Sequence, residues 1–146
     1  MEWIASDAVP KHKKVTYARY VVAYRPEKSE PYRTRITVGG DRLDYNGDVS
    51  TRVSTMETFK MLLNSTVSTP GAKMFTGDIS NMYLNSFLPA SEYVRFHVDL
   101  IPPNIIKHYN LEPLIHNGYI YAKINKAIYG LKQSGKIANQ DLIEHL

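Results

Sequence analysis

Cysteine is absent from the sequence. Its absence excludes disulfide bonds, a catalytic thiol and zinc held by thiolates. Apolar runs are short, well below the roughly 18 residues of a membrane-spanning helix. The first residues also lack the basic-then-apolar order of a signal peptide. We therefore expect an intracellular protein with no membrane partner.

Several common catalytic patterns are also missing. The five histidines have no metal-ligand spacing, and there is no Walker loop, Gly-x-Ser-x-Gly elbow or dinucleotide-binding fingerprint. Tyrosine is abundant, with eleven residues, and the net charge of +4 permits a polyanionic partner without requiring one. The length of 146 residues suits one domain or part of one.

A basic β-hairpin is predicted between Pro10 and Val38. Residues 15–24 and 32–38 alternate in character with the period of two that is typical of strands, and residues 25–31 form a proline-containing turn. Its basic residues are Lys11, Lys13, Lys14, Arg19, Arg25, Lys28, Arg33 and Arg35. Two interpretations remain open. The cations keep a solvated sheet edge from associating, or they grip phosphates with tyrosines between them for stacking.

A helix is predicted from Ser54, because Ser54 and Glu57 form a capping box and Pro70-Gly71 ends the pattern. Its apolar residues recur at helical spacing and predict a helix packed against the core. These residues are Met56, Phe59, Leu62, Leu63 and Val67.

The later segments predict further strands at 93–98 and 119–124, separated by a short helix at 103–109 and a tight Asn117-Gly118 turn. Ser134 is expected to cap a last helix. That helix runs to Leu146 without a stop signal, so we expect a truncated chain. The residues expected on its buried side are Ile137, Ala138, Leu142, Ile143 and Leu146.

The stretch 73–85 has a pattern that can carry chemistry. A short apolar strand is predicted to end at Asp78, followed at once by a helical turn that contains Ile79, Met82 and Tyr83. A carboxylate at a strand end can hold a metal ion or lie beside a phosphate. The structural alternative is an aspartate that merely favours the turn.

Three segments, taken in order, resemble one family. Residues 17–21 read Tyr-Ala-Arg-Tyr-Val, residues 76–85 read Thr-Gly-Asp-Ile-Ser-Asn-Met-Tyr-Leu-Asn, and residues 126–133 read Lys-Ala-Ile-Tyr-Gly-Leu-Lys-Gln. They resemble the Lys-Ala-Arg-Leu-Val, Met-Asp-Val-Lys-Thr-Ala-Phe-Leu-Asn and Lys-Ala-Leu-Tyr-Gly-Leu-Lys-Gln segments of the reverse transcriptase domain of copia-type (pseudovirus-like) LTR retrotransposons. Leu43-Asp-Tyr45 also looks like that family's Asp-Tyr loop.

The resemblance implies RNA-directed DNA polymerase activity, a nucleotidyl transfer across two magnesium ions. Asp78 is implied as a catalytic, metal-binding carboxylate with the Ile79 carbonyl beside the metal, and Tyr83 as the ring that excludes a 2′-hydroxyl. The residues implied to bind the nucleotide are Lys14 and Arg19 over the triphosphate, Tyr83 under the sugar, and Tyr129, Gly130 and Lys132 around the nascent base pair. The implied partners are deoxynucleoside triphosphates, an RNA or DNA template-primer, and the rest of the polyprotein with its remaining palm, thumb and RNase H. The implied location is the cytoplasm, a virus-like particle or the nucleus.

The sequence departs from the family pattern in three places. Tyr17 stands where the family has lysine, Ser134-Gly135-Lys136 stand where it has Ala-Pro-Arg, and the Tyr-x-Asp-Asp hairpin with the other metal carboxylates is missing. One carboxylate cannot hold two magnesium ions, which need several oxygen ligands each. We therefore expect this chain alone to bind Mg²⁺ weakly or not at all and to be inactive as a polymerase.

The expected fold is α+β: the fingers and partial palm of a right-hand polymerase, with a mostly antiparallel sheet and helices packed on one face. Within a single incomplete domain, 1–146, residues 1–70 are expected to be fingers-like and 71–146 to form the partial palm. The alternative function is a non-catalytic nucleic-acid-binding module that uses the basic N-terminal hairpin, with Arg33 and Arg35 on the phosphates.

Overall fold

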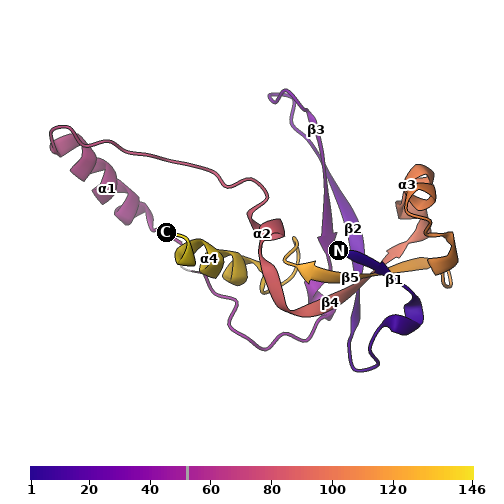
Figure 1. Ribbon diagram of the computed structural model, residues 1–146. Helices are drawn as coiled ribbons and strands as arrows, with labels where there is room; N and C mark the ends of the chain where they lie inside the picture. Colours follow the sequence, from indigo (N-terminus) through magenta and orange to yellow (C-terminus); the bar gives the residue numbers. More distant parts are fainter. Residues whose placement is uncertain (52) are drawn as a thin grey trace.

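The computed structural model describes residues 1–51 and 53–146 (Figure 1). Its strands and α-helices are β1 (Glu2–Ile4), β2 (Val15–Tyr24), β3 (Tyr32–Val38), α1 (Met56–Ser68), α2 (Met82–Asn85), β4 (Phe87–His97), α3 (Pro103–His108), β5 (Tyr119–Lys126) and α4 (Ser134–Glu144). The strands form one sheet in the order β1-β5-β4-β2-β3. Every pairing is antiparallel except that of β2 with β4, so the α+β class and the mostly antiparallel sheet are confirmed. No helix in the described residues is both long and apolar enough to cross a membrane.

The basic hairpin is confirmed as β2 and β3. Its register runs from Ala18 opposite Val38 to Tyr24 opposite Tyr32. The turn is closed by the Arg25 amide, which donates to the Pro31 carbonyl at 2.7 Å. The hairpin projects away from the rest of the sheet (Figure 1), because β2 pairs with β4 only over its first three residues.

The hydrophobic core lies over the two central strands, β4 and β5. Val94, Phe96 and Ile120 are almost fully buried, and the alternation of buried and half-buried residues along β5 shows that one face of the sheet carries the core. Trp3 of the edge strand β1 packs edge-on against Phe96, with ring centroids 5.4 Å apart. Leu111, from the loop after α3, closes one end of this core.

Two glycines bring the β5–α4 loop against the end of β3. The Val38 amide donates to the Tyr129 carbonyl at 2.9 Å. A Cβ atom on Gly40 would clash with the Gly130 carbonyl, and one on Gly130 would clash with the Val38 backbone. Gly130 also has a φ of 100°, a conformation that side chains disfavour. The contact therefore requires glycine at both positions.

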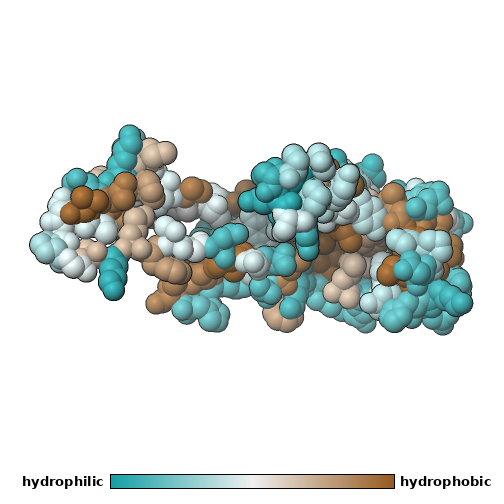
Figure 2. Space-filling model, turned by 90° about the horizontal axis from the view of Figure 1, so that it is seen from above, coloured by the Kyte–Doolittle hydropathy of each residue, from teal (hydrophilic) through white to brown (hydrophobic). Residues whose placement is uncertain are grey.

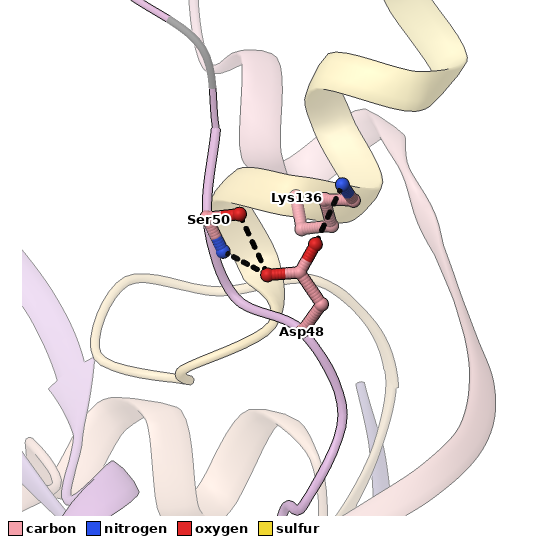
Figure 3. A network of polar contacts seen from close by, with 3 residues as sticks. All are labelled: Asp48, Ser50 and Lys136. Atoms are coloured by element: carbon pink, nitrogen blue, oxygen red, sulfur yellow. Dashed lines mark hydrogen bonds and ion pairs between the residues drawn. The ribbon is translucent and has the colours of Figure 1, made fainter.

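The connection from β3 to α1 is held to α4 by Asp48 (Figure 3). The Asp48 carboxylate accepts hydrogen bonds from the Ser50 hydroxyl at 2.6 Å and the Ser50 amide at 2.8 Å. Lys136 of α4 donates to its other oxygen at 3.1 Å. The Ser50 hydrogen bonds, followed by that of Lys136, lower the pKa of Asp48 well below its ordinary value of 3.8.

The prediction that the helix after Ser54 packs in the core is wrong. Helix α1 forms, but Thr55 is its N-cap and accepts from the Thr58 amide, so the cap is one residue later than predicted. None of its residues is buried: Phe59 is 45% and Val67 79% exposed. The helix lies away from the sheet on two extended connections, and its hydrophobic side chains are open to solvent (Figures 1 and 2). Capping and periodicity are local, whereas burial requires a partner that no described residue provides. The prediction that the helices pack on one face of the sheet is wrong for α1.

The predicted strand ending at Asp78 is absent. Residues 72–79 have no regular structure and Phe75 is 92% exposed. A strand requires a hydrogen-bonded neighbour, and no strand of the described sheet pairs with this segment. Asp78 therefore lies in an extended connection. The helical turn begins at Met82, after Asn81 with a φ of 54°.

The last helix is confirmed as α4, but two details of its prediction are wrong. Ser134 is its first residue rather than its cap, and its hydroxyl bonds to the backbone of Ile128. Ala138 is buried as predicted, whereas Ile143 is 64% and Leu146 96% exposed. No described residue covers the side chains of Ile143 and Leu146. The division into fingers-like and palm-like parts stays a prediction.

The glycine contact predicts a position-specific loss of stability. Gly130→Ala should destabilise the fold by about 2–5 kcal/mol, since it combines a left-handed φ with a backbone clash. Gly71 has a similar φ of 77° but open space around it, so Gly71→Ala should cost only about 1–2 kcal/mol. Urea unfolding of both variants measures the difference. Equal losses would contradict a required close approach at Gly130.

The Asp48 contacts predict that Asp48→Asn speeds exchange of the Ser50 amide, which donates to the Asp48 carboxylate. Asp7→Asn is a matched control, since the exposed Asp7 side chain forms no hydrogen bond or ion pair within the described residues. A lowered pKa means that the contribution of Asp48 is present above the ordinary value of 3.8 and is lost only as the pH falls through the lower folded value. Hydrogen exchange, corrected for intrinsic rates, should therefore give the same protection at about pH 7 and about pH 4. Loss of protection by about pH 4 would contradict the assignment.

Candidate functional site

A polar groove of about 480 Å³ lies between the hairpin and the segment that carries Asp78. Its volume falls in the range of small-molecule sites, roughly 300–1,000 Å³. The lining residues come from the hairpin, the Asp78 segment and the β5–α4 loop. They are Arg25, Glu30, Tyr32, Arg33, Arg35, Asp78, Ile79, Ser80, Asn81 and Tyr129.

Three arginines give this groove its positive wall. Arg33 and Arg35 are two residues apart on β3 and therefore share one face of the hairpin. Arg25 follows β2 on the same face, since it is two residues after Ala23, the partner of Arg33. None of the three forms an ion pair in the described part of the chain. The Arg25 Nε is shielded from solvent and has no hydrogen-bond partner there.

Two tyrosines form the aromatic side of the site. The guanidinium of Arg35 lies 5.1 Å from the centre of the Tyr129 ring. The Tyr83 and Tyr129 ring centroids are 5.2 Å apart at an interplanar angle of 59°. Both rings line a second hollow of about 390 Å³, beside Gly77, Asp78, Ile79, Met82 and Leu142. Asp78 and Ile79 line both spaces, so they connect the arginines to the tyrosine pair.

The structure thus brings six of the predicted site residues together: Arg33, Arg35, Asp78, Ile79, Tyr83 and Tyr129. Gly130 belongs to the same loop, but its role here is the backbone contact with Val38. Lys132 is exposed and lines neither space.

Lys14 and Arg19 lie outside this site. The Lys14 ammonium is 2.7 Å from an Asp44 carboxylate oxygen. Arg19 donates to the Tyr17 hydroxyl at 3.1 Å and lies over the Tyr17 ring. Neither residue lines the groove or the second hollow. The pattern around Tyr17 therefore forms a separate cluster, in which the Tyr17 hydroxyl donates to Asp41.

Sequence reasoning included Arg25 among the basic residues of the hairpin, but it assigned neither Arg25 nor Glu30 to the candidate site. The signal was present, because the alternation of β2 continued by one step places Arg25 on the face of Arg33 and Arg35. The proline-containing turn obscured that register.

The residues present do not fit a two-magnesium centre. Asp78 and Glu30 are the carboxylates that line the groove. The described residues hold no group of three or more His, Cys, Asp or Glu side chains placed to bind a metal ion. The described residues therefore do not supply the ligands of a two-magnesium centre.

Comparison of the chain with protein-family models, curated proteins and solved structures finds no match in any of the three. The resemblance to copia-type reverse transcriptases therefore stays a prediction from the three sequence motifs.

Proposed function

We propose that this chain is part of an RNA-directed DNA polymerase of the copia type and provides a nucleotide-binding fingers and partial palm region. One observation carries the proposal: Asp78, Tyr83 and Tyr129, drawn from two separate motifs, converge beside an arginine-lined groove. The motifs are about fifty residues apart in the sequence, so their convergence does not follow from local structure.

The groove suits the triphosphate of a nucleotide. Arginines bind phosphate through planar, charge-assisted hydrogen bonds, and those of Arg25, Arg33 and Arg35 are not used by ion pairs within the described chain. We assign the phosphates to these three residues in place of Lys14 and Arg19. The tyrosine pair would then contact the sugar and base, next to Asp78.

Catalysis requires further carboxylates. In the proposed complete domain these come from the family's Tyr-x-Asp-Asp hairpin, and with Asp78 they would hold the magnesium ions that stabilise the transferred phosphoryl group. The proposed partners remain the template-primer, deoxynucleoside triphosphates and the rest of the polyprotein.

The phosphate assignment predicts the effect of single substitutions. Arg33→Gln and Arg35→Gln should each weaken binding of dTTP about ten-fold or more, because each removes a charge-assisted hydrogen bond. Isothermal titration calorimetry with the chain in a metal-free buffer measures this effect.

Lys28→Gln is the matched control for this titration, since it removes one positive charge from the hairpin turn without touching the groove. Arg19→Gln tests the motif-based alternative. A loss of dTTP affinity in Arg19→Gln would refute the assignment of the phosphates to the groove arginines. A loss of dTTP affinity in Lys28→Gln equal to that in Arg33→Gln or Arg35→Gln would also refute it.

The carboxylate count predicts that this chain incorporates no nucleotide in primer extension with magnesium. In a polypeptide that also carries the aspartate pair, extension should appear and Asp78→Ala should abolish both extension and magnesium-dependent dTTP binding. Incorporation by the present chain would contradict this prediction. No extension by the longer polypeptide would contradict the polymerase proposal, and extension that survives Asp78→Ala would contradict the catalytic role of Asp78.

The second candidate function is a non-catalytic nucleic-acid-binding module, favoured by the three arginines on one hairpin face that lack ion-pair partners in the described chain. It predicts that Asp78→Ala leaves or improves oligonucleotide binding. Arg33→Ala and Arg35→Ala should each weaken binding and reduce the slope of log affinity against log salt by about one. Fluorescence titrations at several salt concentrations separate the two functions.

A further inference from the structure

The face of the hairpin opposite the arginines is aromatic and apolar, and near the tip it is uncovered. Strand alternation places Tyr20, Val22 and Tyr24 of β2 on this face, with Tyr32 of β3 opposite Tyr24. Toward the base of the hairpin the same face is buried in the core, where Ala18 is 7% exposed. Toward the tip Val22 is 66%, Tyr24 63% and Tyr32 73% exposed. Nothing in the described chain covers the tip.

The two tip tyrosines form a pair. Tyr24 and Tyr32 are the last cross-strand partners before the turn, with ring centroids 5.1 Å apart and an interplanar angle of 39°. Their contact fixes the orientation of the rings and leaves their outer faces open. No hydrogen bond engages either hydroxyl in the described residues. Large aromatic rings held open in this way are typical of binding surfaces.

The positive charges around this pair indicate what would cover it. Arg25, Arg33 and Arg35 lie on the reverse of the same two strands, and Lys28 lies in the turn. A two-stranded ribbon is a single backbone layer thick, so these charges are close to anything bound at the tip. Hydrophilic side chains also gather over this part of the molecule when the hairpin tip faces the viewer (Figure 2). A ligand with flat apolar faces and regularly spaced negative charges fits this surface.

We infer that the Tyr24–Tyr32 pair is a stacking site for unpaired bases of single-stranded nucleic acid, whose phosphates lie toward the cations of the hairpin. Base–aromatic stacking combined with a basic track is the usual mode of single-strand binding. The inference rests on the proposed function in one respect: the bound strand would be the unpaired part of the template. It adds a contact surface at the tip, where Tyr24 faces away from the arginine groove and Tyr32 also borders that groove.

A second protein copy is the competing occupant. The open edge of β3 carries Arg33 and Arg35, and positive charges on an edge strand oppose pairing with an identical edge. The exposed tip also offers few residues, far below the roughly 20–30 per partner in a standard protein interface. Nucleic acid is therefore the occupant that the chemistry favours.

The test is fluorescence anisotropy with labelled oligothymidylate and oligouridylate, in EDTA, on the full chain. Tyr24→Ala and Tyr32→Ala should each weaken binding by about five- to 150-fold. Tyr24→Phe and Tyr32→Phe should bind as the parent chain does, because stacking needs the ring and not the hydroxyl.

Tyr109→Ala is the matched control, since Tyr109 is 56% exposed but lies after α3, away from the hairpin. An abasic oligomer of equal charge should bind all variants equally, because it offers no ring to stack. Circular dichroism confirms that each variant is folded.

Three results would overturn the inference: no loss with either tip variant, an equal loss with Tyr109→Ala, or an equal loss on the abasic oligomer. Sedimentation velocity tests the competing occupant. A dimer that dissociates in Tyr24→Ala, with oligonucleotide binding unchanged, would assign the face to a second copy instead.

This outcome is separable from that of the polymerase proposal. Stacking is measured without metal or nucleotide, whereas the polymerase proposal depends on primer extension by the longer polypeptide. Retained stacking with failed extension would leave the tip site intact and remove the polymerase. The opposite result is also possible: the longer polypeptide extends a primer, but the tip variants lose no affinity for the oligonucleotide. That result would support the polymerase and remove the tip site.

Discussion

The close approach of the β5–α4 loop to the end of β3 is the contact on which both the fold and the site depend. It exists because Gly40 and Gly130 have no side chains and because Gly130 adopts a positive φ. The Val38 amide then reaches the Tyr129 carbonyl, and the Tyr129 ring lies between Arg35 and Tyr83. If this loop were displaced, the arginine groove would lose one wall and the tyrosine pair would separate. A glycine that sequence reasoning assigns to nucleotide contact is thus, in the structure, a packing residue that positions its neighbour.

Local features of the fold could be predicted from the sequence because local chemistry determines them. The hairpin strands 15–24 and 32–38 and the Asn117-Gly118 turn follow from alternation and from residues that tolerate positive φ. The formation of α1 likewise needs only a cap and a helical pattern. Convergence of Asp78, Tyr83 and Tyr129 was expected from the family resemblance, not from any local pattern, since no spacing rule connects positions 78 and 129.

The errors in prediction concern contacts that a linear pattern does not contain. An amphipathic stripe such as that of α1 indicates a face that benefits from burial, but it does not name the surface that covers it. The apolar segment 73–77 has the composition of a strand, yet its backbone finds no partner in the sheet. Arg19 satisfies a motif by residue type and Lys14 lies just upstream of it, whereas Tyr17 and Asp44 engage them elsewhere. In each case a competing or missing tertiary partner decided the outcome.

The distal hairpin is held less firmly than its base, and this matters for what it binds. Beyond Tyr17, β2 loses its pairing with β4, so the tip is a two-stranded ribbon with no core beneath it. Isolated two-stranded hairpins are marginally stable in water, and regions with few buried contacts open at low cost in free energy. The stability of the tip therefore depends on cross-strand pairs such as Tyr24–Tyr32 and on the proline-containing turn. A ligand that bridges the rings on one face and the arginines on the other would contact both strands at once. Binding and ordering of the tip would then be coupled, since each contact that holds the ligand also holds β2 against β3.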